Sequence, residues 1–154
     1  MNEEAHKELK KLFNGRFSTS QSTRANYARG EDTFDPVLSK GVVFPETNEE
    51  VSKILKICNE YSVPVVPFGT GTSLEGNVVG NDQGITISLE KMNKVLSVNV
   101  EDFDCRVQAC VTKEQLNDYL REDGVFFPID PGANAAIGGM ASTSASGTMA
   151  VKYG

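Results

Sequence analysis

The sequence predicts an α+β fold that begins with a parallel strand–helix–strand unit and continues with an antiparallel pair of strands. The first unit is indicated by two short apolar runs that flank a helix-periodic stretch within residues 41–67. The strand pair is indicated by two β-rich runs, separated by turn residues, within residues 95–111. A capping pair at Thr112 and Gln115 then starts a further helix.

The first 35 residues are expected to form a helical extension ahead of the sheet. Residues 3–13 carry Leu and Phe at helical spacing, which predicts a short amphipathic helix. A brief helical turn is expected within residues 23–34, because Asp35-Pro36 breaks any longer helix. The main domain is therefore expected to cover residues 36–154.

The segment from Gly41 to Pro67 predicts a strand, a helix and a second strand. Thr47 and Glu50 have the spacing of a capping box, in which each residue satisfies a backbone N–H group of the other. The helix that follows has one apolar face that is expected to pack on the sheet, made of Val51, Ile54, Leu55 and Cys58. A unit of this length predicts that strands 41–44 and 63–67 form a parallel pair with a right-handed crossover.

The second half of the chain predicts three more strands and a helix. Residues 84–89 alternate between apolar and polar side chains, as a strand does. Residues 95–100 and 105–111 flank a polar turn and predict an antiparallel hairpin. The helix that starts at Thr112 ends at Gly124 and carries the apolar residues Leu116, Tyr119 and Leu120.

A glycine-rich loop directly follows the second predicted strand. Residues 67–77 read P-F-G-T-G-T-S-L-E-G-N and include no Lys or Arg. Glycine lets the backbone approach a ligand closely and adopt positive φ. Successive exposed N–H groups in such a turn form a concave nest that suits phosphate oxygens. The loop is also expected at the carboxyl end of a strand, where open α/β sheets bind ligands.

Two familiar phosphate-binding motifs do not account for this loop. A Walker A motif requires Gly-Lys followed by Ser or Thr, and the loop has no Lys. The Rossmann pattern requires a third glycine where this chain has Leu74, and the polar residues 77–84 open no helix. An ordinary surface turn is the alternative to a phosphate site.

A second segment of small residues, 130–147, favours a ligand site. It reads D-P-G-A-N-A-A-I-G-G-M-A-S-T-S-A-S-G and has little apolar area to bury. A flat or extended ligand can therefore lie directly against its backbone, beside the hydroxyl groups of Ser142, Thr143, Ser144 and Ser146. A flexible linker is the alternative, against which Ile137 and Met140 provide apolar anchors.

The two segments together resemble the vanillyl-alcohol oxidase / p-cresol methylhydroxylase family of flavoproteins. The resemblance includes the motifs P-F-G-T-G-T-S-L-E-G-N and I-G-G-M-A-S-T-S-A-S-G, the final K-Y-G and the earlier V-V-F-P-E-T-N-E-E-V. Within that family the chain is most similar to the D-lactate dehydrogenase and glycolate oxidase flavoprotein-subunit branch. The resemblance implies an FAD-binding domain of two small α/β subdomains, of which these residues are the N-terminal and C-terminally incomplete part. The first would hold the parallel β-α-β unit, and the second a mixed or antiparallel sheet with a helix.

The resemblance also implies which residues bind FAD. The first loop would wrap the diphosphate through Pro67, Gly69, Thr70, Gly71, Thr72 and Ser73, and Gly76 and Asn77 would complete the turn. The second segment would line the ribityl and isoalloxazine side through Pro131, Gly138, Gly139, Ser142, Ser144, Ala145 and Gly147. The family often has Asn where this chain has Ser144.

The function implied by the resemblance is hydride transfer from the hydroxyl carbon of a small 2-hydroxy acid, D-lactate or glycolate, to FAD. Electrons would pass to a quinone, a cytochrome or an electron-transfer flavoprotein. The family's substrate-binding groups lie in a later domain, so the catalytic residues are unknown and these 154 residues alone are expected to be inactive. The alternatives are another FAD-linked oxidoreductase of the superfamily and a catalytically inactive nucleotide-binding fragment.

Composition and charge exclude several other classes of protein. The net charge is −6 and the 15 basic residues are not clustered, which argues against nucleic-acid binding. No apolar run reaches the length of a transmembrane segment, and the acidic start lacks the apolar core of a signal peptide, so a cytoplasmic location is expected. The spacing of Cys58, Cys105 and Cys110 predicts reduced thiols and no metal site. His6, in a charged helix, is expected to be solvated.

Overall fold

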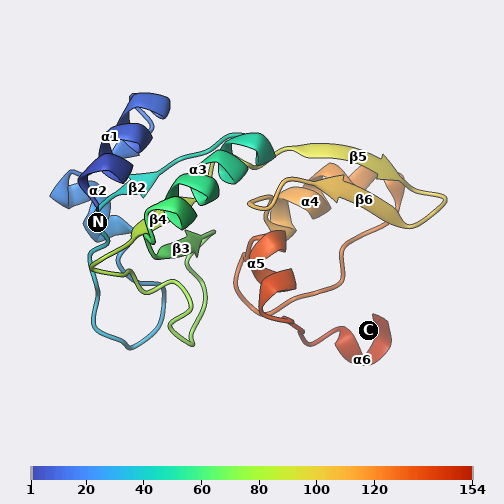
Figure 1. Cartoon of the computed structure of the whole chain (residues 1–154). Coiled ribbons are helices and arrows are strands. Elements are labelled where there is room, and N and C mark those ends of the chain that lie inside the picture. Colours follow the sequence, from blue (N-terminus) through green and yellow to red (C-terminus); the bar gives the residue numbers. More distant parts are fainter. Residues whose placement is uncertain (1, 154) are drawn as a thin grey trace. The chain divides into compact units, whose positions relative to one another are not determined.

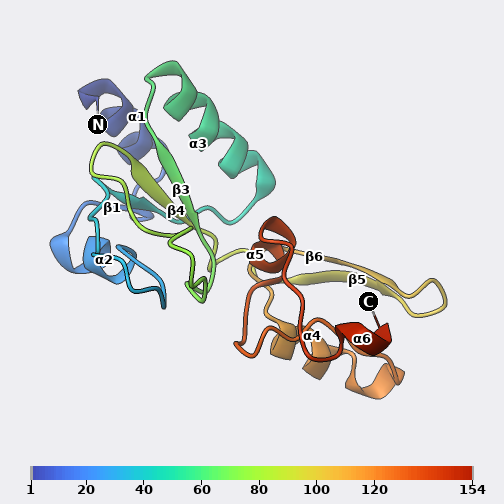
Figure 2. The same cartoon turned by 90° about the horizontal axis from the view of Figure 1, so that it is seen from below.

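The fold consists of two compact units that meet at Lys91 in the chain. It is known from a computed structural model that describes residues 2–153 (Figures 1 and 2). We call residues 1–91 unit 1 and residues 92–154 unit 2. Each unit has its own hydrophobic core. The predicted α+β class is confirmed, since both units combine small sheets with helices.

Unit 1 contains a four-stranded sheet in the order β1-β2-β4-β3. The strands are β1 (Phe17–Ser18), β2 (Val42–Val43), β3 (Val65–Phe68) and β4 (Ile85–Ser88). β1 is antiparallel to β2, whereas β2 and β3 both run parallel to β4.

The predicted pairing of the strands around the first long helix was wrong in one respect. β2 and β3 are parallel, as predicted, but β4 lies between them and pairs with both. All four residues of β4 are buried, whereas β3 is only partly covered. The most buried strand takes the central position because both of its faces and both of its edges must be shielded from water.

The helices of unit 1 are α1 (Glu3–Leu12), α2 (Gln21–Asn26) and α3 (Asn48–Glu60). α1 lies beside α3, as Figure 2 shows, and the two helices pack against the sheet through Ala5, Leu9, Phe13, Ile54, Ile57 and Cys58. The predicted apolar face of α3 needs one correction, because Leu55 is 46% exposed and Ile57 is buried in its place. Positions 54, 57 and 58 share one side of a helix, and position 55 is rotated away from it.

The first 35 residues supply α1, β1 and α2, and all three belong to unit 1. The helix predicted over residues 3–13 is therefore present. The brief helical turn predicted within residues 23–34 corresponds to α2, which begins two residues earlier, at Gln21, and ends at Asn26. Ser20 caps α2, since its Oγ accepts a hydrogen bond from the N–H of Thr23.

Arg16 joins the strand β1 to the start of α3. Its guanidinium donates to both carboxylate oxygens of Glu50, at 2.7 and 2.6 Å, and to the carbonyl of Phe44 at 3.2 Å. The capping box is therefore only half formed. Thr47 accepts from the N–H of Glu50, while the Glu50 carboxylate turns to Arg16 and to the N–H of Glu46. These hydrogen bonds, chiefly those from Arg16, lower the pKa of Glu50 to about 2.

Unit 2 begins with the predicted antiparallel hairpin, formed by β5 (Val95–Asn99) and β6 (Asp104–Val107). β6 ends four residues earlier than predicted, because residues 108–111 form a turn closed by a hydrogen bond from the N–H of Val111 to the carbonyl of Gln108. The helices that follow are α4 (Lys113–Tyr119), a 3-10 turn η1 (Arg121–Asp123), α5 (Ile137–Ser142) and α6 (Ala150–Tyr153).

The core of unit 2 is smaller than that of unit 1. Val111, Leu116 and Leu120 are buried there and pack against the inner side of the hairpin. Tyr119, predicted on the apolar face of α4, is 59% exposed instead. Thr112 caps α4 as predicted, but the side chain of Gln115 donates to the carbonyl of Asn93 rather than completing a capping box.

Cys58 and Cys110 are buried, whereas Cys105 is exposed. Burial raises the pKa of the Cys58 thiol to about 11, so it stays protonated and unreactive at neutral pH. Among residues 2–153 no group of three or more His, Cys, Asp or Glu side chains is arranged to hold a metal ion. The helices of this part of the chain are also too short or too polar to cross a bilayer.

Replacing Glu50 by Gln tests the Arg16 pair. We expect Glu50→Gln to lower the free energy of unfolding by about 1–2 kcal/mol at neutral pH, as for a half-buried, charge-assisted pair. The pKa of Glu50 falls from 4.5 to about 2 on folding, so its stabilisation is full above 4.5 and is lost as the pH falls towards 2. Chemical denaturation over this pH range measures the effect.

The matched control is Glu60→Gln, which changes an exposed residue at the other end of α3. It is expected to change stability little at any pH. A Glu50→Gln deficit that stays constant from neutral to acidic pH would contradict an ionic origin.

Candidate cofactor-binding site

The glycine-rich loop follows β3 at its carboxyl end, as the sequence predicted. Pro67 lies within β3 rather than in the loop, opposite Ile87 of β4. β3 is an edge strand of the sheet, which is where a residue without an N–H group is tolerated. Phe68 is buried, and its carbonyl accepts from the N–H of Leu89, so the base of the loop is fixed to β4.

The loop presents backbone donors that no protein group uses. Within the described residues, the N–H groups from Gly69 to Leu74 donate to no backbone or side-chain acceptor. Gly71 and Gly76 both have positive φ, at 76° and 72°, a conformation that glycine adopts readily. Unused N–H groups in a glycine-rich turn of this kind suit anionic oxygens without a cation.

Residues 28–34 brace the loop from behind, which the sequence did not suggest. The N–H of Glu31 donates to the carbonyl of Gly71 at 2.9 Å. A Cβ atom added to Gly30 would lie 2.4 Å from that same carbonyl oxygen, so only glycine fits there. The 7% exposed Asp32 fixes the turn, because its carboxylate accepts from the N–H groups of Gly30 and Phe34.

Aromatic rings support the same loop from below. Tyr27 makes edge-to-face contacts with Phe44 and Phe68, with ring centroids 5.6 and 5.0 Å apart. The Phe68 ring in turn fills the space beside Gly71, where an added Cβ would lie 2.8 Å from it. Tyr27 also donates its hydroxyl to Glu90 at 2.5 Å. The loop therefore rests on a packed base.

The second candidate segment, in unit 2, includes a helix that the sequence did not predict. Residues 137–142 form α5, because the N–H groups of Ile137 and Gly138 are tied to the carbonyls of Val111 and Ala109. Met140 is buried, and Ile137 packs on the core of unit 2, so both act as the expected anchors. The absence of a polar N-cap and the run of small residues hid this helix from pattern analysis.

Asp130 fixes the entrance to this segment. Its carboxylate pairs with Lys113 at 2.9 Å and accepts from the N–H of Gly132 at 3.2 Å. The Lys113 ammonium, more than the Gly132 N–H, lowers the pKa of Asp130 below its usual value. Pro131 follows in an exposed position.

The small residues of the second segment serve two different purposes. Gly138 and Gly147 are required by the fold, because an added Cβ would lie 2.8 Å from Ala109 and 1.9 Å from the carbonyl oxygen of Asp130. Gly139 has nothing within 4 Å of the same position. Ser144 is exposed and adopts a positive φ of 52°, a conformation that Asn tolerates better than Ser.

The remaining candidates in unit 2 are held by backbone contacts. The Ser142 hydroxyl donates to the carbonyl of Gly138 at 2.8 Å, and the Ala145 N–H donates to the carbonyl of Met140 at 2.9 Å. In unit 1, Thr70 and Thr72 share a weak hydroxyl contact of 3.4 Å, while Asn77 is exposed. The structure thus gathers each set of candidates within its own unit.

Three curated relatives share close sequence similarity with the chain. It is 48% identical to a probable mitochondrial D-lactate dehydrogenase of Danio rerio over 89% of this chain and 28% of that protein. It is 42% identical to a mitochondrial D-lactate dehydrogenase [cytochrome] of Arabidopsis thaliana over 96% of this chain and 26% of that protein. It is 30% identical to the glycolate oxidase subunit GlcD of Bacillus subtilis over 90% of this chain and 30% of that protein. The chain therefore spans less than a third of the length of these relatives.

Solved structures share the fold at lower sequence identity. An alkyldihydroxyacetonephosphate synthase matches all of this chain and 31% of its own, with a TM-score of 0.90 and 24% identity. A p-cresol methylhydroxylase matches 82% of this chain and 25% of its own, with a TM-score of 0.64 and 20% identity. At these identities the likeness concerns the fold alone.

Adding a methyl group at Gly30 tests the brace behind the loop. We expect Gly30→Ala to lower the free energy of unfolding of unit 1 by about 2–3 kcal/mol, because the new Cβ would overlap the Gly71 carbonyl. Amide NMR shifts of residues 69–74 are expected to move as well. Asn26→Ala, an exposed change in α2, serves as the control and is expected to leave those shifts unchanged. Unperturbed stability and shifts in Gly30→Ala would disprove the brace.

A family model for an FAD-binding domain matches residues 39–154, most of the chain. The match includes both small-residue segments, and FAD is the cofactor that it and the relatives support. The resemblance seen in the two motifs is thereby confirmed. The chain belongs to the FAD-binding domain family.

Proposed function

We propose that this chain is the FAD-binding portion of a flavin-dependent 2-hydroxy-acid dehydrogenase or oxidase. The observation that carries the proposal is the row of backbone N–H groups from Gly69 to Leu74 that donate to no described protein acceptor. These donors lie in a loop without cations, in a chain 48% identical to part of a D-lactate dehydrogenase. A diphosphate is the ligand that such a row of neutral donors fits best.

The loop of unit 1 is proposed to bind the FAD diphosphate through Gly69, Thr70, Gly71, Thr72 and Ser73. The peptide N–H groups and the three hydroxyls supply hydrogen bonds to phosphate oxygens. Pro67 lies in β3 just before the loop and is proposed to set its direction, while Gly76 and Asn77 return the chain. The brace at Gly30 and Asp32 holds the donors in place before the ligand arrives, which lowers the entropic cost of binding.

The second segment is proposed to face the ribityl chain and the isoalloxazine ring. Pro131, Gly139 and Ser144 are open to a ligand, and Ser142 and Ala145 lie on either side of Ser144 in sequence. Gly138 and Gly147 contribute by keeping the backbone close-packed. FAD, when bound, supplies the hydride acceptor, and the chain supplies position and hydrogen bonds.

The substrate of the whole protein is proposed to be a small 2-hydroxy acid such as D-lactate or glycolate. The names of the relatives support this class, and the cytochrome in one of them supports a cytochrome as electron acceptor. A quinone and an electron-transfer flavoprotein are the other proposed acceptors. The carboxylate clamp and the catalytic base are proposed to lie beyond Gly154, since the candidate segments contain no His or Arg.

Two alternative functions are another FAD-linked oxidoreductase and a catalytically inactive nucleotide-binding fragment, and either would use the same loops.

We propose that the FAD-binding domain starts near residue 36, which the family match from residue 39 supports. A cytoplasmic location remains a prediction, and the mitochondrial names of two relatives favour the organelle instead.

A methyl group at Gly139 tests contact with the cofactor separately from folding. The chain is expected to bind added FAD, measured by visible absorption and by quenching of flavin fluorescence. Gly139→Ala is expected to fold as well as the parent, because its Cβ would meet nothing within 4 Å, but to bind FAD about tenfold more weakly.

The control Glu122→Ala changes an exposed residue of η1 in the same unit. Equal FAD affinity in all three proteins would show that the flavin does not approach Gly139, and no FAD binding by the parent would favour the inactive fragment.

Turnover provides an independent test of where the catalytic groups lie. We expect the FAD-loaded chain to show no oxidation of D-lactate or glycolate with an artificial electron acceptor. The physical reason is that the described residues offer a cofactor cradle without a carboxylate clamp beside it. Oxidation above the rate of free FAD would contradict the assignment of substrate binding to residues beyond Gly154.

A further inference from the structure

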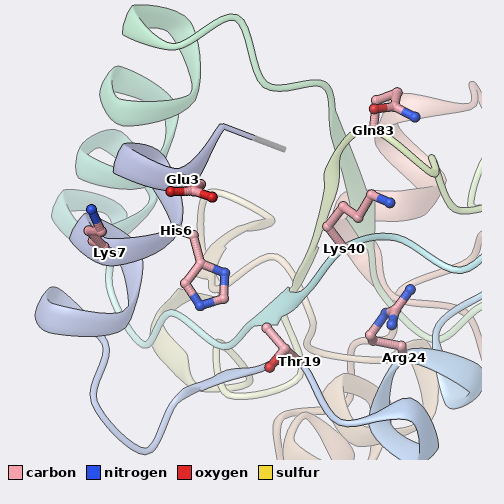
Figure 3. Close-up of a pocket in the computed structure, with 7 residues that line it drawn as sticks. All are labelled: Glu3, His6, Lys7, Thr19, Arg24, Lys40 and Gln83. Atoms are coloured by element: carbon pink, nitrogen blue, oxygen red, sulfur yellow. The ribbon is translucent and has the colours of Figure 1, made fainter.

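Unit 1 contains a polar pocket that is separate from the glycine-rich loop. Its volume is about 590 Å³, within the range typical of small-molecule sites. It is lined by Glu3, His6, Lys7, Thr19, Arg24, Lys40 and Gln83, which Figure 3 shows as sticks. These residues come from α1, the segment between β1 and α2, α2 itself, the turn before β2 and the turn before β4. None of them belongs to the proposed FAD-binding set.

The pocket holds two cationic side chains without a carboxylate partner. Among the described residues, neither Arg24 nor Lys40 has an acidic oxygen within 4 Å. Lys7 differs, because it pairs with Glu4 at 2.9 Å and turns away from the other lining residues in Figure 3. Glu3 is the one acid among the lining residues. The pocket is therefore locally basic in a chain whose net charge is −6.

Hydrogen bonds at the base of the pocket fix the Arg24 side chain and the backbone of Lys40. The Arg24 Nε donates to the carbonyl of Ser39, which leaves the outer guanidinium nitrogens free of described partners. Ser39 is 1% exposed, and its hydroxyl binds Thr86 of β4 at 2.8 Å and the N–H of Asn81 at 3.1 Å. The backbone N–H of Lys40 donates to the carbonyl of Gly84 at 2.8 Å.

Three further residues add hydrogen-bonding groups to the pocket. His6 stands edge-to-face against Phe17, with ring centroids 5.4 Å apart, and this contact orients the imidazole. Figure 3 shows His6 and Thr19 across from Arg24 and Lys40. Gln83 contributes a side-chain amide. Guanidinium, ammonium, imidazole, hydroxyl and amide groups together form a donor set suited to an oxyanion.

We propose that this pocket binds a compact oxyanion with more than one negative charge, held mainly by Arg24 and Lys40. A phosphate ester and a di- or tricarboxylate share this chemistry and are the two sources to distinguish. The ligand is small, because two cations in one pocket lack the extended basic surface that a nucleic acid requires. The proposal is independent of FAD binding, because it uses none of the same residues.

Titration of the whole 154-residue chain with citrate and, separately, with inorganic phosphate tests the proposal. Calorimetry gives the affinity, and amide NMR shifts locate the site. We expect saturable binding of at least one probe, with shifts at residues 6, 19, 24, 40 and 83. Preference for citrate identifies a polycarboxylate, and preference for phosphate identifies a phosphate ester.

Lys40→Gln is the decisive variant, because the Lys40 ammonium has no described partner whose loss would disturb the fold. It is expected to weaken binding about tenfold, as is Arg24→Gln. The matched control Lys56→Gln removes the same charge from the exposed face of α3 and is expected to change affinity less than twofold. Equal weakening by all three variants would show diffuse charge attraction and overturn the proposal.

Two further outcomes would also overturn it. One is the absence of saturable binding of either probe. The other is displacement of citrate or phosphate by FAD together with weakened FAD binding in Lys40→Gln, which would assign the pocket to the cofactor. FAD affinity is read from flavin absorption, so failure of the pocket and failure of the FAD proposal give different results.

Discussion

The buried strand β4 is the constraint on which the rest of unit 1 depends. It lies between β2 and β3, all of its residues are buried, and it pairs with both neighbours in parallel. Through Leu89, just beyond the strand, it fixes the carbonyl of Phe68 and hence the base of the glycine-rich loop. Through Thr86 it fixes Ser39, which in turn holds Arg24 in the second pocket. Both anion-binding hypotheses therefore rest on the same strand, because a central parallel strand has little freedom to move.

The two proposed sites in unit 1 would attract negative charge by different means. The loop from Gly69 to Leu74 offers neutral N–H groups, which bind an anion closely and require a fixed backbone. The pocket offers the full charges of Arg24 and Lys40, which act over a longer distance and are more sensitive to salt. The brace at Gly30 and Asp32 matters for the first site only, since peptide dipoles lose their effect when they point in different directions.

The fold alone does not decide the reaction. The same architecture occurs in an alkyldihydroxyacetonephosphate synthase and in a p-cresol methylhydroxylase. The names of these two proteins differ, and at 24% and 20% sequence identity each shares only the fold with this chain. The described residues supply hydrogen-bond donors and a rigid backbone, and such groups serve any reaction of a bound flavin. We therefore propose that substrate choice belongs to groups outside the two candidate segments.

The sequence by itself determined the local structure: the helices capped by Thr47 and Thr112, the hairpin, and the loop in which Gly71 and Gly76 adopt positive φ. These features depend on residues a few positions apart, which a pattern records. Only the tertiary structure decided that β4 separates β2 from β3, that Ile57 rather than Leu55 enters the core, and that Gly30 supports Gly71. It also made a helix of residues 137–142, which lack a polar cap. Each of these depends on burial and contact between segments far apart in the chain, where the free energy of packing outweighs local preference.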